Sequence, residues 1–193
     1  MITHIAGKLV EKNPTDVIID CNGIGYFINI SLHTFSKIPD QEHIKLYTYF
    51  QVREDAHTLY GFSSLAEREI FRLLISVSGI GTNTARTMLS SLTPTQVKEA
   101  IASEDVAVIQ SVKGIGSKTA QRVIIELKDK VLKVYDIDES VMSPNNTNRD
   151  EALSALEVLG FAKKQSERVV DKILKTQYDA AVETIIKEAL KNL

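Results

Sequence analysis

The spacing of hydrophobic residues changes once along the chain, near residue 63. Before that point, short segments rich in β-branched and aromatic residues are separated by turn signals, which is typical of strands. The expected strands cover residues 2–12, 15–21, 24–31, 43–52 and 57–62. In the fourth of these, alternation places Ile44, Leu46, Thr48, Phe50 and Val52 on one side.

The turns and the number of strands indicate how this segment closes. Asn22-Gly23 lies between two strands and predicts a type I′ hairpin, because both central residues of that turn need positive φ. An open five-stranded sheet would leave two bare edges. We therefore expect residues 1–63 to form a small closed barrel of the five-stranded OB type.

After Phe62 the hydrophobic period becomes helical. Ser64 and Glu67 are spaced as a capping box ahead of an apolar stripe, and Thr93 and Gln96 repeat that spacing around a proline at the first helical position. The stripe consists of Ile70, Phe71, Leu74 and Ile75. Residues 64–134 are expected to form a small all-helical domain.

The C-terminal third reads as a linker followed by three helices. Residues 135–148 lose periodicity and collect Asp, Ser, Pro and Asn, which indicates a flexible linker. Helices are expected over 149–159, 163–175 and 178–193, with Gly160 as a C-cap and Phe161 packing back on the first helix. A three-helix domain this small, residues 149–193, has a marginal core and suits partner docking.

One ten-residue sequence occurs twice in the helical segment. Residues 76–85 read SVSGIGTNTA and residues 111–120 read SVKGIGSKTA, with seven of ten positions identical. In each copy two glycines allow a sharp turn, and the isoleucine between them is expected to plug the turn into the core. A single Gly-x-Gly is often only a helix–helix turn, but two matching copies favour a shared function.

The chemistry predicted for this repeat is phosphate binding. Exposed amides at the start of a helix, together with its positive dipole end, form an anion site. Ser117 adds a hydroxyl, and Lys118 and Arg122 place charges on the first turns of the second helix. Neither copy completes a nucleotide-binding motif, so no ATPase site is expected. The hairpins should bind DNA backbone without sequence preference.

Composition narrows the remaining function classes. The net charge is −2 and the pI is near 6.1, which is not the usual signature of a nucleic-acid-binding protein, yet residues 64–134 alone carry a net positive charge. Cys21 is the single cysteine, and the four histidines lack ligand spacing, so we expect no disulfide, metal or cofactor. With no apolar run or signal peptide visible, a cytoplasmic protein is expected.

At this point the pattern resembles the RuvA family of bacterial Holliday-junction-binding proteins. The resemblance rests on VREDAHTLYGF at 52–62, the two helix-hairpin-helix repeats, the acidic linker and the terminal helices. It implies a multidomain α+β fold of an OB-type barrel, a tandem helix-hairpin-helix domain and a UBA-like three-helix module. It also implies a non-catalytic subunit that binds four-way junctions in recombination, DNA repair and the SOS response.

The resemblance further implies partners and site residues. The expected assembly is a homotetramer, or two facing tetramers, that recruits the hexameric ATPase RuvB through the C-terminal domain, with the resolvase RuvC as a further candidate partner. The implied DNA contacts are Gly79, Gly81, Thr82, Asn83, Gly114, Gly116, Ser117, Lys118 and Arg122. The implied acidic pin at the crossover is Glu54 and Asp55. The candidate partner-binding residues are Leu156, Leu159, Ile185, Ile186 and Leu190.

Three questions remain open at the level of sequence. Asn83 stands where many relatives have lysine, so the first hairpin is either weaker or compensated by Arg86 one turn later. The carboxylates of Glu54 and Asp55 could simply solubilise a hairpin tip. A nuclease that uses this pair to bind a metal, and an interaction scaffold that touches no DNA, are the alternative functions.

Overall fold

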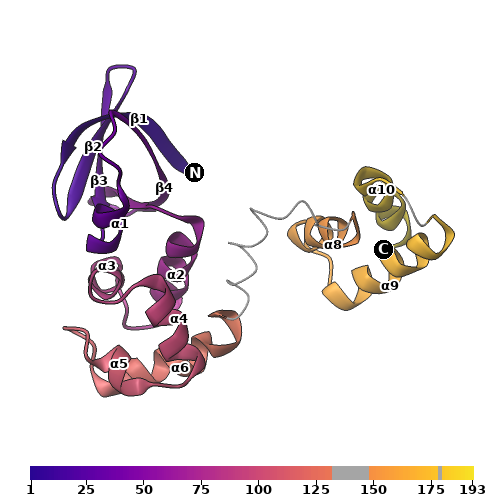
Figure 1. Cartoon of the computed structure of the whole chain (residues 1–193). Helices are drawn as coiled ribbons and strands as arrows, with labels where there is room; N and C mark the ends of the chain where they lie inside the picture. Colours follow the sequence, from indigo (N-terminus) through magenta and orange to yellow (C-terminus); the bar gives the residue numbers. More distant parts are fainter. Residues whose placement is uncertain (132–147, 178–179) are drawn as a thin grey trace. The chain divides into compact units, whose positions relative to one another are not determined.

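A computed structural model describes residues 1–131, 148–177 and 180–193, which fall into two compact units (Figure 1). The first unit holds the β-strands and the middle helices, and the second holds the C-terminal helices. The predicted linker, residues 135–148, lies outside the described residues except for Asn148, which begins a helix. No described helix has the length and apolar character needed to cross a membrane.

The N-terminal strands form the expected closed five-stranded barrel. They are β1 (His4–Lys12), β2 (Asp16–Cys21), β3 (Ile24–Ile30), β4 (His43–Val52) and β5 (His57–Phe62). Their order is β1-β2-β3-β5-β4, and only the β3–β5 pair is parallel among these strands. The type I′ hairpin is confirmed, since Asn22 and Gly23 have φ of 53° and 89°.

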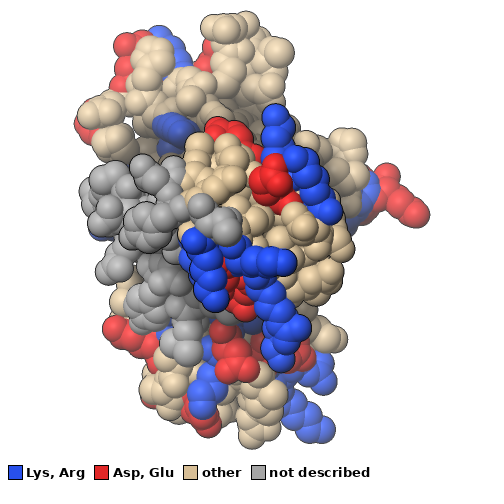
Figure 2. All heavy atoms as spheres, turned by 90° about the vertical axis from the view of Figure 1, so that its right-hand side faces the viewer, with Lys and Arg blue, Asp and Glu red and all other residues tan. Residues whose placement is uncertain are grey.

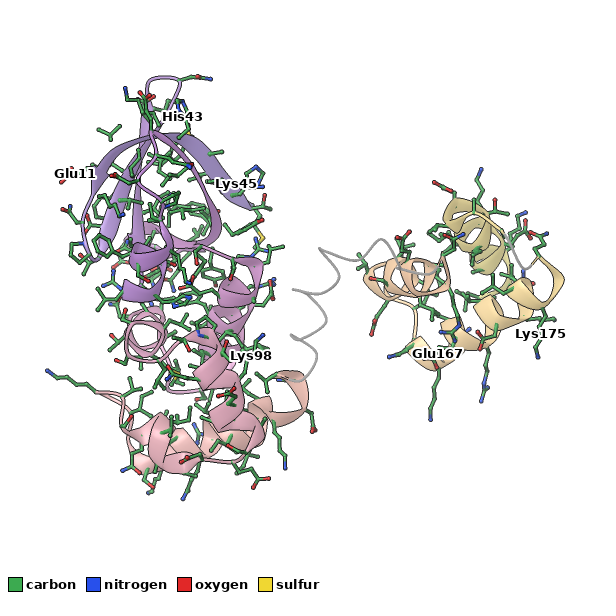
Figure 3. All side chains as sticks on the ribbon, viewed as in Figure 1. Glu11, His43, Lys45, Lys98, Glu167 and Lys175 are labelled. Atoms are coloured by element: carbon green, nitrogen blue, oxygen red, sulfur yellow. The ribbon has the colours of Figure 1, made fainter. Side chains whose placement is uncertain are left out.

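The side of β4 that carries Ile44, Leu46, Thr48, Phe50 and Val52 is buried only along its first part. Ile44, Leu46 and Thr48 are buried in β4, but Phe50 is half-buried and Val52 is 61% exposed. The reason is that β4 pairs with β1 over His43–Tyr47 and with β5 over Tyr47–Val52, so its last residues have only one neighbouring strand. The distal part of the β4–β5 hairpin therefore projects away from the core. Figure 3 shows the polar side chains of Glu11, His43 and Lys45 on the outside of the barrel.

The middle segment is all-helical, as predicted. Its helices are α2 (Leu65–Ser76), α3 (Thr82–Ser91), α4 (Pro94–Ala102), α5 (Val106–Gln110) and α6 (Ser117–Val131). Phe71 of α2 is fully buried and packs against two rings of β5, with centroid distances of 5.3 Å to Tyr60 and 4.9 Å to Phe62. The end of β5 therefore belongs to the hydrophobic core of the helices, while the interior of the barrel forms a second core of its own.

A short helix that the sequence analysis missed, α1 (Leu32–Lys37), joins the barrel to α2 through a buried carboxylate. Glu67 has 0% exposure. One of its oxygens accepts from the Ser31 hydroxyl at 2.6 Å; the other accepts from the Thr34 hydroxyl at 2.7 Å and from the N–H and hydroxyl of Ser63 at 3.1 and 3.0 Å. Both oxygens of this carboxylate thus accept hydrogen bonds inside the unit.

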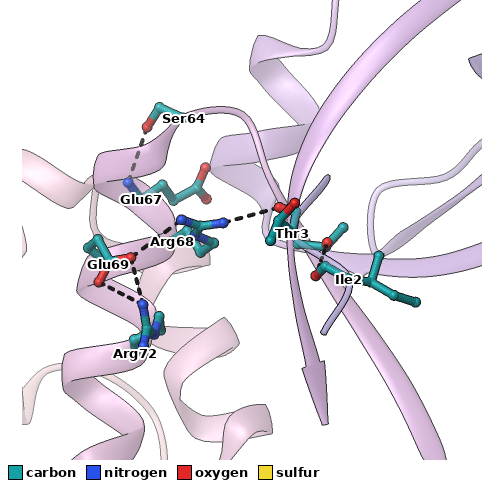
Figure 4. A network of polar contacts seen from close by, with 8 residues as sticks. Ile2, Thr3, Ser64, Glu67, Arg68, Glu69 and Arg72 are labelled. Atoms are coloured by element: carbon teal, nitrogen blue, oxygen red, sulfur yellow. Dashed lines mark hydrogen bonds and ion pairs between the residues drawn. The ribbon is translucent and has the colours of Figure 1, made fainter. Parts of the chain in front are cut away.

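Of the two predicted capping boxes, the one at the start of α4 is complete and the one at the start of α2 is not. The Thr93–Gln96 capping box is complete. At the start of α2, Ser64 accepts from the Glu67 N–H at 3.1 Å, but the Glu67 carboxylate bonds Ser63 and α1 instead of closing the box. Figure 4 shows this cap and the neighbouring Arg68, whose guanidinium donates to the Thr3 carbonyl at 3.1 Å. The predicted box is therefore only half formed, because the carboxylate has buried partners.

The second unit consists of α8 (Asn148–Val158), α9 (Lys163–Thr176) and α10 (Val182–Asn192). Gly160 has φ of 96°, and the N–H groups of Gly160 and Phe161 donate to the carbonyls of Glu157 and Leu156, so the predicted glycine cap is confirmed. The third helix was predicted to begin at Tyr178, which lies outside the described residues; α10 begins at Val182.

Candidate nucleic-acid interface

The two repeats fold into hairpins with matching backbone hydrogen bonds. In the first, between α2 and α3, the Ile80 N–H donates to Val77 at 3.0 Å. In the second, between α5 and α6, the Ile115 N–H donates to Val112 at 3.1 Å. The helix that follows each turn begins with equal bonds of 2.9 Å, from Ala85 to Gly81 and from Ala120 to Gly116. The same turn has therefore been built twice.

The first glycine and the isoleucine of each hairpin behave as predicted, but the second glycines, Gly81 with φ of −86° and Gly116, do not adopt the positive φ that was expected of them. Gly79 and Gly114 adopt φ of 95° and 92°, in the left-handed region that other residues avoid. Ile80 and Ile115 are each 5% exposed and anchor their turns in the core. The amides that begin α3 and α6 have no intrahelical acceptor, and the helix dipoles make these ends positive. Each hairpin thus has the backbone geometry that an anion site requires.

The side chains of the second hairpin face solvent. Ser117 and Lys118 are exposed, and neither makes a side-chain hydrogen bond or ion pair within the described parts of the chain. Lys113, in the turn itself, is exposed in the same way. The sequence analysis missed Lys113, although the alignment of the two repeats could have found it, since Ser78 takes its place in the first. The second hairpin therefore combines its amides with two lysines and a hydroxyl.

The first hairpin has no such side chains available. Thr82, predicted as a DNA contact, is 5% exposed, and its hydroxyl accepts from the Tyr60 hydroxyl at 2.9 Å and donates to Gln51 at 3.2 Å. Only the backbone amide of Thr82 is left for a ligand. Asn83 is exposed and uncharged. The guanidinium of Arg86, one turn later, donates through one nitrogen to Asn29 of the barrel at 2.8 Å and to the Thr15 carbonyl at 3.4 Å, so it is partly engaged within the unit.

Arg122 is half exposed and also bonded within the unit. Its side chain is 51% exposed, but its guanidinium donates to the Ser78 carbonyl of the first hairpin at 3.1 Å and lies 3.9 Å from Glu126. This predicted phosphate contact therefore also ties the second hairpin to the first. Elsewhere on α6, Lys128 is paired with Glu104, and this hydrogen bond lowers the pKa of the Glu104 carboxyl.

The predicted acidic pin lies at the tip of the β4–β5 hairpin. The Arg53 N–H donates to the Ala56 carbonyl at 2.9 Å and closes the loop, with Glu54 and Asp55 exposed between them. Neither carboxylate makes an ion pair or hydrogen bond in the described part of the chain. Within the same residues, no group of three or more His, Cys, Asp or Glu side chains is placed to hold a metal ion.

The candidate partner-binding residues divide into two sets. Leu156 and Ile185 are fully buried in the core of the second unit, so their prediction as partner contacts is wrong. Ile186 is half-buried, while Leu159 and Leu190 are 58% and 45% exposed. Leu159, Ile186 and Val158, which the prediction omitted, line an open groove of about 500 Å³ beside α8. A small bundle buries one stripe of each helix and leaves the rest outside.

The charge of the surface is mixed. On the face shown in Figure 2, lysine and arginine side chains gather in groups with aspartate and glutamate beside them. The chain as a whole carries 23 basic and 25 acidic residues. The net charge therefore gives the chain no broad electrostatic attraction to DNA.

Fold and site together define the class: a tandem helix-hairpin-helix protein with an N-terminal five-stranded barrel and a C-terminal three-helix module. Residues 1–61, 71–129 and 147–193 match the families described as RuvA N terminal domain, SAM-like helix-hairpin-helix tandem and RuvA C-terminal domain. Over its whole length the chain is 68% identical to the Holliday junction branch migration complex subunit RuvA of Christiangramia forsetii and 64% identical to that of Flavobacterium psychrophilum, each covered completely. The subunit of Cytophaga hutchinsonii is 52% identical, with 99% of both chains covered. The chain belongs to the RuvA family.

Proposed function

We propose that this protein binds four-way (Holliday) DNA junctions by their shape and serves as the non-catalytic DNA-binding subunit of a branch migration complex. The observation that carries the proposal is the pair of equivalent glycine hairpins, in a chain whose full-length relatives are named as subunits of that complex. Two hairpins suit the two strands of one duplex arm. Four subunits would then hold four arms.

The contacts proposed for each arm are with phosphates. The first hairpin binds through the amides around Gly79 and Gly81, and the second through those around Gly114 and Gly116. Ser117 and Lys118 reinforce the second hairpin, as does Lys113. None of these groups is arranged to read a base edge, so the binding is independent of sequence.

Glu54 and Asp55 are proposed to act at the crossover as an acidic pin. Their exposure at the tip of a projecting hairpin supports this role. Like charges about 4 Å apart repel by roughly 1 kcal/mol in water and about 4 kcal/mol at an effective dielectric constant near 20. Stacking holds a base-pair step by only about 1.4 kcal/mol. Carboxylates from four subunits would therefore penalise a continuous duplex that lies across the centre.

The proposed assembly is a homotetramer, or two facing tetramers, with the hexameric ATPase RuvB recruited by the C-terminal domain, residues 149–193. RuvC would act on the same junction. The exposed apolar groove beside α8 supports a docking role for this domain. The nuclease alternative, which needs a metal at Glu54 and Asp55, is favoured by no observation in the described residues.

The first test is competition binding of the purified chain to a synthetic four-way junction and to linear duplex of the same arm sequence, between about 0.05 and 0.2 M salt. Preference for the junction with a steep salt dependence is expected. Equal, weak binding to both DNAs would contradict the proposal. The double variant Glu54→Gln, Asp55→Asn should bind linear duplex more tightly than the parent, and unchanged duplex binding would remove the pin from the mechanism.

A second test concerns the partner. Leu159→Asp combined with Leu190→Asp should abolish stimulation of the RuvB ATPase while junction binding stays at the parent level, because both side chains are exposed and remote in sequence from the hairpins. Gln165→Asp, an exposed polar site on α9, is the matched control and should stimulate normally. Full stimulation by the leucine variant would place the docking surface elsewhere.

A further inference from the structure

The threonine that begins α3 is used differently from its counterpart in the second repeat. Ser117 begins α6 and exposes its hydroxyl to solvent. Thr82, at the equivalent position, turns its hydroxyl inward, where it accepts from Tyr60 at 2.9 Å and donates to Gln51 at 3.2 Å. Both Thr82 and Tyr60 are 5% exposed, so these bonds form in a buried site. The hydroxyl of the second repeat, on Ser117, therefore faces solvent, whereas that of the first repeat, on Thr82, is hydrogen-bonded to the barrel.

Both partners of Thr82 belong to the strands that carry the acidic tip. Gln51 lies on β4 three residues before Glu54, and it pairs with Thr58 of β5 in the strand ladder. Tyr60 lies on β5 and pairs with Tyr49. Beyond Tyr47, β4 pairs in the ladder with β5 only, although Thr48 still donates to the carbonyls of Thr3 and Ile2 and Tyr49 packs on Phe71. The projecting hairpin is therefore held from the side by the Thr82 hydroxyl.

The backbone of the same threonine belongs to the anion site. Its N–H is among the first amides of α3, next to Gly81, and these amides have no intrahelical acceptor. A single residue thus connects the amides that would hold a phosphate with the strands that carry Glu54 and Asp55. Its side chain fixes the distance between an attractive site and a repulsive one.

We propose that Thr82 is a positioning residue that sets the acidic tip against the first hairpin and so determines how strongly the protein prefers a four-way junction over linear duplex. The inference rests on the proposed function. Coulomb repulsion falls inversely with distance, so a carboxylate that withdraws from about 4 to about 6 Å from a phosphate loses about a third of its repulsion. The hairpin amides meanwhile stay in place. Loosening the tip should therefore relieve the penalty on duplex more than it changes junction binding.

The test uses the full chain with Thr82→Val, which keeps the branched shape and the backbone N–H but removes the hydroxyl. Dissociation constants are measured for a four-way junction and for linear duplex of the same arms, and their ratio is compared with that of the parent. The ratio should fall about three- to tenfold, mainly through tighter duplex binding. Thr82→Ser, which restores the hydroxyl, should recover most of the preference. Thr84→Val is the matched control, because it makes the same change two residues along α3 at a hydroxyl with no hydrogen bond in the described residues.

If Thr82→Val does not fold, Tyr60→Phe removes the same hydrogen bond from its other end and leaves the ring in the core. A ratio within twofold of the parent for the folded variant, or an equal loss with Thr82→Ser, would overturn the inference while leaving the proposed function intact. A parent chain that shows no preference for the junction would overturn both.

Discussion

Replacing Glu67 with glutamine should destabilise the first unit strongly, although the two side chains have nearly the same size. The carboxylate is fully buried and accepts four hydrogen bonds, from Ser31, Thr34 and Ser63. Glutamine offers one acceptor oxygen and an NH₂ group. If its oxygen takes the place of the one that accepts three bonds, the NH₂ must face Ser31, whose hydroxyl already accepts from the Thr34 N–H at 3.0 Å.

The magnitude follows from these bonds. A hydrogen bond to a charged group contributes about 1.5–3 kcal/mol net and a neutral one about 0.5–1.5 kcal/mol, so each retained bond loses about 1 kcal/mol. Three retained bonds give a destabilisation of about 3 kcal/mol. For a chain of this size that corresponds to a decrease of about 10 °C in the melting temperature.

The assay is urea and thermal unfolding followed by near-ultraviolet circular dichroism. Four of the six tyrosines lie in β3, β4 and β5, so this signal reports mainly on the barrel. Glu99→Gln, an exposed carboxylate on α4, is the control and should stay within about 0.5 kcal/mol of the parent. If Glu67→Gln unfolds within about 1 kcal/mol of the parent, the buried carboxylate contributes no more than an amide would, and the reasoning is refuted.

Three further predictions concern the hairpins and the C-terminal module. Lys118→Gln should weaken junction binding and reduce the slope of log affinity against log salt by about 0.9, whereas Asn83→Lys should increase that slope by the same amount, as measured by titrations at several salt concentrations. Gly114→Ala should lower the free energy of unfolding by about 1–2 kcal/mol because φ is 92°, while Gly116→Ala, with open space around the added Cβ and no positive φ, should not. The Arg149 guanidinium donates to Asp171 at 2.8 Å and lowers the pKa of that carboxyl. The pair therefore stabilises the module above the ordinary aspartate pKa, and this contribution is lost as the pH falls through the lowered pKa. Asp171→Asn should flatten this acid dependence in a pH series of melting temperatures.

Much of this fold could be predicted because its signals are local. Alternation and turn chemistry identified the five strands, and the repeated glycines identified both hairpins, since only glycine readily adopts the φ found at Gly79 and Gly114. The six-residue helix α1 was missed because it is too short to show a helical period. Val52 was misplaced because alternation describes the faces of a strand but does not show where its second neighbour ends.

The site was harder to predict, because exposure depends on contacts between distant segments. The sequence gives Thr82 and Ser117 equivalent positions, yet one is buried under Tyr60 and the other is open. Arg86 reads as a free cation one turn after Asn83, but Asn29, 57 residues earlier in the chain, binds its guanidinium. Leu156 and Leu159 share one helical pattern, and only the packing of α8 separates the buried residue from the exposed one.

The hydrophobic cluster that joins β5 to the helices, with Phe71 packed on Tyr60 and Phe62, has a consequence for avidity. Because both hairpins are fixed in one unit and Arg122 of the second donates to Ser78 of the first, their separation does not have to be found when DNA arrives. In the proposed complex, once one hairpin binds a phosphate, the other is held near the neighbouring strand at a high effective concentration. The entropy of arranging the two sites is lost during folding and not during binding. Individually weak amide contacts can therefore add up to stable binding, provided that the spacing of the two DNA strands matches the fixed distance between the two hairpins.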